Sequence, residues 1–294
     1  MSWTIIFLSL WLSIVVYYYV FVHDEYKETF QNIQTEFVSP SIAQEYLNNL
    51  PEFNSYLIKV PKIQYTFKTN GQLNQTANVQ QFRDYYLSKI KPWNENEIIT
   101  IKKSLVSILP KTTSYSKIWS LPWRFIKIDP DLEGGMPFTF GNTILIPETI
   151  IISSNRFHET LFHEKIHVLQ KADPEGWATR IQEKLPWMQK IPDDKLPFGF
   201  KDSYLMNPDG TDINWIYIIN NKKYIPYLSY DKGNVTSKIW NCQQIDADFR
   251  RQIKINESWY HPNEYLATSI TTLVFYPDSF KSNFVLIDFE TLLK

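Results

Sequence analysis

The sequence is poor in cysteine and in glycine. Cys242 is the only cysteine among 294 residues, which excludes an internal disulfide framework and a zinc cluster built from cysteine ligands. Only eight glycines occur, and the chain contains neither GxGxxG nor GxxxxGK[ST]. We therefore do not expect a glycine-rich loop that binds phosphate groups.

The chain also lacks an excess of charge of either sign. Thirty basic and 31 acidic residues give a net charge of -1, which argues against a dedicated nucleic-acid-binding protein. Hydrophobic residues make up 44% of the chain and charged residues 21%. This composition excludes a disordered protein and predicts a packed core, in one large domain or two small ones.

The N-terminus consists of a long apolar run. Residues 3–22 (WTIIFLSLWLSIVVYYYVFV) contain no charged side chain. As a helix they would span about 30 Å, the hydrocarbon thickness of a bilayer. We therefore expect residues 1–23 to form an uncleaved, single-pass transmembrane signal-anchor.

Two alternatives to this anchor remain open. One is a cleaved signal peptide, although the run exceeds the usual apolar length and no small-residue cleavage site follows. The other is a buried core helix. The acidic flank at residues 23–28 favours a single-pass membrane protein whose body lies on the non-cytoplasmic side.

The rest of the chain mixes helical and strand patterns. We expect a polar helical region over residues 24–50 that breaks at Pro40, and a strand-like section around Tyr56–Phe67. Further expected elements are helices over 78–91, 95–109 (ended by Pro110), 154–172 and 262–275, strands over 123–128, 213–219 and 224–228, a hairpin of 138–140 and 143–146, and turns at 134–135 and 209–210. Helices and strands are segregated along the chain, which predicts an α+β fold.

Residues 163–167 read His-Glu-Lys-Ile-His, a pattern that indicates a metal site. Residues four apart share one face of a helix, so His163 and His167 can bind one zinc ion. Glu164 can then reach a water beside the metal without being a ligand. His158 lies five residues before His163, the wrong spacing for one face, and we do not expect it to be a ligand. The alternative is a pair of histidines satisfied by local hydrogen bonds.

This HExxH motif resembles that of the zincin metallopeptidases, in which a third protein ligand completes the zinc site. Residues 263–267 read Asn-Glu-Tyr-Leu-Ala, which is similar to the Asn-Glu-x-x-Ala setting of the third ligand in gluzincins. The resemblance thus implies Glu264 as the third ligand. Asp173, at a spacing like that of metzincins, and Asp212, in a faintly aspzincin-like setting, are the alternatives.

The zincin resemblance also implies how the site would work. Glu164 would act as the general base, and a hydrogen-bond donor near the metal would stabilise the developing oxyanion. Candidates for that donor are Tyr260, His261 and Tyr265. Gln170 lies on the same stripe of the helix as the two histidines, so it could orient a ligand. By analogy with zincins, an edge strand near residues 143–146 would bind the substrate by strand addition.

We therefore expect three regions: a membrane anchor at 1–23, a helical stalk or N-terminal subdomain at 24–115, and a zincin-like catalytic domain at 116–294. The predicted function is that of a membrane-anchored zinc metallopeptidase acting on peptides or proteins, with no nucleic-acid partner. An inactive zinc-binding protein of zincin type, serving as a membrane-bound binding or structural module, is the main alternative. A membrane-anchored interaction protein without a metal is a further one.

Overall fold

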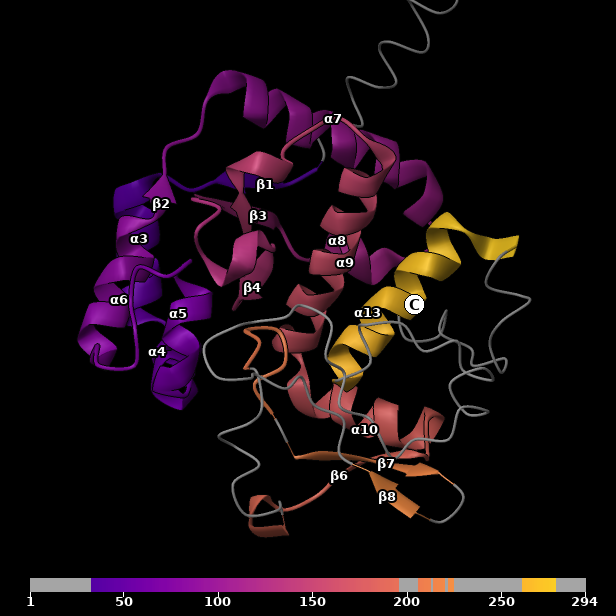
Figure 1. Cartoon of the computed structure of the whole chain (residues 1–294). Helices are drawn as coiled ribbons and strands as arrows, with labels where there is room; N and C mark the ends of the chain where they lie inside the picture. The colour runs from indigo at the N-terminus through magenta and orange to yellow at the C-terminus, as the bar shows by residue number, and fades with distance from the viewer. Residues whose placement is uncertain (1–32, 196–205, 213, 220–221, 225–260, 279–294) are drawn as a thin grey trace, which may run out of the picture.

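The computed structural model describes residues 33–195, 206–212, 214–219, 222–224 and 261–278. Two of its helices, α9 and α13, lie side by side near the centre of the molecule (Figure 1). In chain order the elements are β1 (Thr35–Phe37), α3 (Pro40–Asn49), α4 (Pro51–Lys59), η2 (Lys62–Gln64), α5 (Tyr65–Lys68), α6 (Val79–Ser88), β2 (Ile90–Lys91), α7 (Glu95–Thr112), α8 (Ser116–Ser120), β3 (Trp123–Ile128), η3 (Glu133–Gly135), β4 (Phe138–Phe140), β5 (Thr143–Pro147), η4 (Glu148–Ile150), α9 (Asn155–Ala172), α10 (Pro174–Lys184), β6 (Met188–Lys190), η5 (Asp193–Lys195), β7 (Trp215–Ile219), β8 (Lys222–Tyr224) and α13 (Pro262–Phe275).

The strand-like section expected around Tyr56–Phe67 is wrong, because this region is helical. Helix α4 begins with Pro51 in its first turn, a position where the missing N–H of proline costs no helical hydrogen bond. Its buried residues Phe53, Tyr56 and Leu57 follow the spacing of one helix face. The short helices η2 and α5 complete the section.

Three further expectations need correction. Residues 35–37, placed in a polar helix, form strand β1 and pair in parallel with β3. Helix α7 does not end at Pro110 but runs to Thr112, since a proline near the last turn removes only one hydrogen bond of the helix. The helix expected over 78–91 ends at Ser88, and residues 90–91 pair with β3 as strand β2.

Other expected elements are confirmed. The 154–172 and 262–275 helices are α9 and α13, the 123–128 strand is β3, and β4 and β5 form the hairpin. Strand β7 covers most of 213–219, whereas residues 225–228 lie outside the described ranges. Gly210 N–H donates to the Asn207 carbonyl at 3.1 Å, which closes the turn at 209–210. At 134–135 both glycines have positive φ, as a tight turn requires.

The main sheet has the order β1-β3-β5-β4, with β2 also paired to β3. Strands β1, β3 and β5 are parallel, and β4 runs antiparallel to β5. The sheet thus combines strands from the region predicted as a stalk or N-terminal subdomain (24–115) with strands from the region predicted as the catalytic domain (116–294). Residues 143–146 belong to β5, which lies between β3 and β4. It is β4 that forms this edge of the described sheet.

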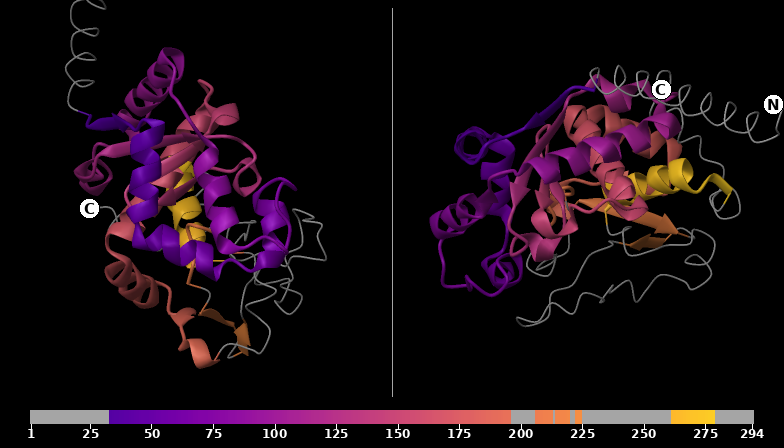
Figure 2. Two further views of the ribbon diagram at one scale, coloured as in Figure 1. Left: turned by 90° about the vertical axis from the view of Figure 1, so that its left-hand side faces the viewer. Right: turned by 90° about the horizontal axis from the view of Figure 1, so that it is seen from above.

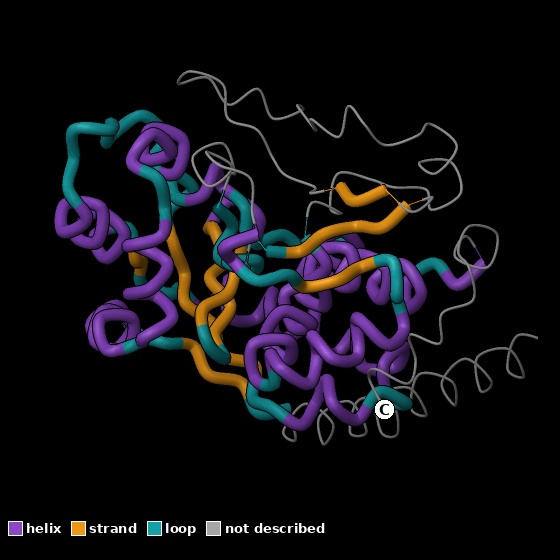
Figure 3. Tube along the Cα trace, turned by 90° about the horizontal axis from the view of Figure 1, so that it is seen from below, coloured by secondary structure: helices purple, strands orange, loops and turns teal. Residues whose placement is uncertain are grey.

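Each face of the sheet packs against helices, as Figures 2 and 3 show. On β3, Trp123 and Phe125 join a hydrophobic cluster with α7, α9, α10 and α13. Ile126 and Ile128 join a second cluster with the N-terminal helices α3 to α6. Side chains that alternate along a strand point to opposite faces, so this strand supplies both cores and is buried on both sides.

A second, small sheet of order β6-β7-β8 follows helix α10. Met188 and Tyr217 from this sheet are buried in the same cluster as α9. Within the described ranges no helix is both long and apolar enough to cross a membrane. The predicted anchor at residues 1–23 lies outside those ranges.

Candidate metal centre

Helix α9 places two histidines and a glutamate in the interior. Its first turn is capped by Ser154, whose hydroxyl accepts the N–H of Phe157 at 3.2 Å. Its apolar residues from Leu161 to Leu169 belong to the hydrophobic cluster that also contains residues of α7 and α13. Glu164 and His167 are buried, while the side chain of His163 keeps 22% exposure. The site is therefore reached from the side of His163.

Three side chains converge on one point. His163 Nε2 and His167 Nε2 are 3.0 Å apart. Glu264 Oε2 lies 3.2 Å from the first nitrogen and 3.5 Å from the second. These three residues form the group of potential metal ligands found among the described residues.

The spacing of these three atoms suits zinc. A tetrahedral zinc with bonds of 2.0–2.2 Å requires its ligand atoms to be about 3.3–3.6 Å apart. The observed separations of 3.0, 3.2 and 3.5 Å differ from that range by at most a few tenths of an ångström. Two imidazoles and one carboxylate are also a donor set that zinc accepts, with a fourth position left for water or substrate.

Helix α13 positions Glu264 in its first turn. Pro262 begins the helix, and His261 caps it by accepting the N–H of Asn263 at Nδ1, at 3.1 Å. Leu266 and Ile270 are fully buried against α9. The apolar face of α13 thus fixes where Glu264 projects.

The charges of the cluster favour a cation. Burial lowers the pKa of His167, but the carboxylates of Glu264, Asp209 and Glu164 outweigh burial and raise it to about 10. Burial likewise raises the pKa of Glu264, yet the two histidines hold it well below its ordinary value. A divalent cation would place positive charge at the same point with both imidazoles neutral.

Glu164 is a buried acid beside this cluster. Its Oε2 is buried and has no hydrogen-bond partner among the described residues. Burial and the nearby Asp209 carboxylate raise its pKa well above the ordinary value. A buried carboxylate oxygen without a donor is costly, and a water beside a metal would satisfy it.

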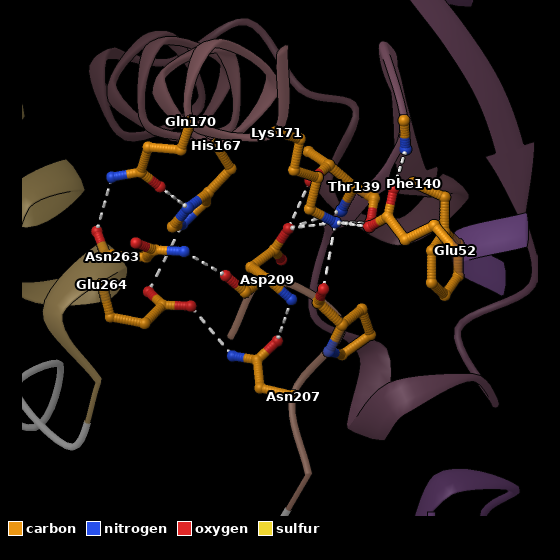
Figure 4. Close-up of polar contacts among 12 residues, drawn as sticks. Glu52, Thr139, Phe140, His167, Gln170, Lys171, Asn207, Asp209, Asn263 and Glu264 are labelled. Carbon is orange, nitrogen blue, oxygen red and sulfur yellow. Dashed lines mark hydrogen bonds and ion pairs between the residues drawn. The ribbon is translucent and has the colours of Figure 1, made fainter. Parts of the chain in front are cut away.

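Gln170 orients His167, as the helix spacing predicted. Its Nε2 donates to the carbonyl of Asn263 at 3.1 Å, so its Oε1 must face His167 Nδ1, which lies at 2.8 Å. An amide oxygen only accepts, so His167 carries its proton on Nδ1. In the neutral form that a metal would bind, the lone pair on Nε2 is therefore directed toward the ligand cluster, and Figure 4 shows this chain of contacts.

The edge strand β4 is covered by a polar network that the sequence did not reveal. Asp209 Oδ1 accepts the N–H of Thr139 at 3.0 Å, and Lys171 donates to the Thr139 carbonyl (Figure 4). Lys171 also pairs with Glu52 at 2.7 Å and lies 3.4 Å from Asp209. The backbone groups that an added strand would use at Thr139 are thus already bound.

The structure does not bring the alternative third ligands to the cluster. The Asp173 side chain accepts the N–H of Gly176 and pairs with Arg180 at 2.9 Å. Asp212 pairs with Lys190 at 2.8 Å. Both carboxylates are more than half exposed, and neither belongs to the group of potential metal ligands.

The two expected oxyanion donors that the structure describes, His261 and Tyr265, have other partners. Tyr260 lies outside the described residues. His261 is occupied at both nitrogens, since its Nε2 donates to the Asp212 carbonyl at 2.9 Å while Nδ1 caps α13. Tyr265 is buried in the hydrophobic core against Trp187, and burial raises its pKa. His158 lies in the first turn of α9 and is not part of the ligand group.

Comparison with known proteins adds no relative. No protein-family model matches the chain, and neither a curated protein nor a solved structure does. The resemblance to zincin metallopeptidases therefore rests on residues 163–167 and on the side chains around Glu264.

Proposed function

We propose that this protein is a zinc metallopeptidase of gluzincin type, with an α+β zincin-like domain anchored in a membrane by residues 1–23 and lying on the non-cytoplasmic side. The observation that supports the activity is the tetrahedral spacing of His163, His167 and Glu264 beside a buried glutamate without a hydrogen-bond partner among the described residues. Peptides or proteins are the proposed substrates. Because the charge of the chain is balanced, we do not propose nucleic acid as a partner.

His163, His167 and Glu264 would hold the zinc ion. When bound, zinc polarises a carbonyl group and lowers the pKa of water in its open coordination position. Gln170 keeps His167 in the tautomer that binds through Nε2. Every ligand of this set lies on α9 or α13, two helices that pack directly on each other, so the set is rigid.

Glu164 would act as the general base. Its carboxylate would take a proton from the attacking water at Oε2 and later pass it to the leaving amine. Because the carboxylate is buried, little water competes for that proton.

The test uses the full-length protein in detergent, with zinc content measured by mass spectrometry and turnover measured on a quenched-fluorescence peptide library. We expect about one zinc per chain in the wild type, and loss of this zinc in His163→Ala. Glu164→Gln should keep the zinc and lower turnover by about 10²–10⁴-fold. His158→Ala and Glu159→Gln, which change the same helix outside the cluster, serve as matched controls.

Two results would contradict the proposal. A folded wild-type protein that binds no zinc after supplementation excludes the metal centre. Zinc binding without cleavage of any peptide, in wild type as in Glu164→Gln, favours the inactive zincin-like binding protein instead.

A further inference from the structure

The two oxygens of Glu264 lie in different surroundings. Oε2 faces His163 and His167, at 3.2 and 3.5 Å. Oε1 accepts a hydrogen bond from Asn207 Nδ2 at 2.9 Å. Asn207 comes from a segment 57 residues before Glu264, and the HExxH motif gives no hint of it. A carboxylate held through one oxygen presents the other in a fixed direction.

The orientation of the Asn207 amide is determined by its own neighbours. Its Oδ1 accepts the N–H of Asp209 at 2.9 Å, and its carbonyl accepts the N–H of Gly210 at 3.1 Å. A backbone N–H can only donate, so the amide oxygen must face Asp209. The amide nitrogen is then left to donate to Glu264. Asn263, next to Glu264, donates to the Asp209 carbonyl at 3.1 Å and joins this turn to α13.

Met206, the residue before Asn207, is held by side chains of the N-terminal helices η2 and α5. Gln64 Oε1 accepts the N–H of Met206 at 3.0 Å, and Lys68 Nζ donates to the Met206 carbonyl at 2.6 Å. Lys68 is paired with Glu133 at 2.6 Å, and both side chains are almost completely buried. The N-terminal helices thus fix both backbone polar groups of Met206.

We propose that Asn207 is a positioning residue that presents Oε2 of Glu264 to the metal, and that the buried contacts of Met206 hold Asn207 in place. This inference rests on the proposed zinc site. Loss of the donor from Asn207 frees Glu264 to rotate or to bind the metal through both oxygens. Outer partners of metal ligands commonly change metal affinity by about 10–100-fold, and we expect a change of that size.

The test compares wild type, Asn207→Ser and the control Asn142→Ser in full-length protein. A serine hydroxyl can still accept the N–H two residues on, but it is too short to reach Glu264. Asn142 lies in the β4–β5 turn and contacts Tyr46 and Thr143, outside this network. Zinc affinity is measured by competition with a chelator. The visible spectrum of the cobalt-substituted protein reports the coordination geometry.

We expect Asn207→Ser to bind zinc about 10–100-fold more weakly and to shift the cobalt bands. Loss of the hydrogen bond to the buried carboxylate should also lower its urea midpoint without metal, so the shift of the cobalt bands in the folded protein separates positioning from a merely structural role. Zinc affinity within twofold of wild type, with an unchanged cobalt spectrum, overturns the inference while leaving the proposed function intact. A wild type that binds neither metal overturns both.

Should Asn207→Ser fail to fold, Asn207→Thr provides the same hydroxyl on a residue with a different backbone preference. The same two outcomes then decide the inference.

Discussion

The cap of helix α13 should make folding depend on pH. His261 is almost fully buried, at 2% exposure. Its Nδ1 accepts the N–H of Asn263, and its Nε2–H donates to the Asp212 carbonyl. Only a neutral imidazole can do both. Burial lowers the pKa of His261 to about 4, against 6.5 for an ordinary histidine, and the neighbouring Asp212 opposes this only in part.

The sign of the effect follows from these two pKa values. In the unfolded chain the histidine takes up a proton near pH 6.5, whereas the folded protein resists protonation down to about pH 4. The stability associated with this neutral cap is therefore complete above pH 6.5 and is lost as the pH falls toward 4. Between pH 7 and pH 5 the free energy of unfolding should fall by about 2 kcal/mol from this residue alone.

The assay is urea unfolding of full-length protein in detergent at pH 7 and pH 5, with a chelator present so that metal binding does not contribute. His261→Asn is the comparison, because asparagine caps a helix without titrating in this range. The wild type should lose about 2 kcal/mol more than the variant on acidification. Equal losses in the two proteins would refute the reasoning.

Three further predictions concern single side chains. Lys68→Met leaves the carboxylate of Glu133 buried without its cation, and should lower the free energy of unfolding by about 3–5 kcal/mol in urea titrations; adding Glu133→Gln should recover part of that loss. Gln170→Ala removes the hydrogen bond to His167 Nδ1 and should weaken zinc binding by about 10–100-fold in chelator competition, and an unchanged affinity would argue against its orienting role. Asp173→Asn should leave the zinc content unchanged in mass spectrometry, whereas loss of zinc would move the third ligand to Asp173.

The local sequence pattern was sufficient to predict an element when that element has its own periodicity and its own end signals. Helix α9 has a serine cap, one apolar face and Asp173-Pro174 at its end, and α13 begins at Pro262. Both were predicted within a residue. The section from Tyr56 to Phe67 was not, because its many aromatic and β-branched residues suit a strand as well as a buried helix face.

The candidate site likewise has a part that the sequence predicted and a part that only the tertiary structure decided. The sequence alone determined that His163 and His167 share one helix face, since four residues make about one helical turn, and it placed Gln170 on that stripe. The short Asn-Glu-x-x-Ala pattern pointed to Glu264 but left Asp173 and Asp212 open. Only the packing of α13 on α9 brings Glu264 within 3.5 Å of both imidazoles.

The partner of Glu264, and the contacts that hold this partner in place, were decided by tertiary structure alone. Asn207 reaches Glu264 across 57 residues, and Lys68 reaches Met206 across 138. A hydrogen bond between residues so far apart leaves no periodic pattern in the sequence. It requires only one donor and one acceptor, and the whole fold decides which two residues come together. A turn at Asp209-Gly210 can be predicted from its two residues, but not the strand edge and the helix end between which it lies.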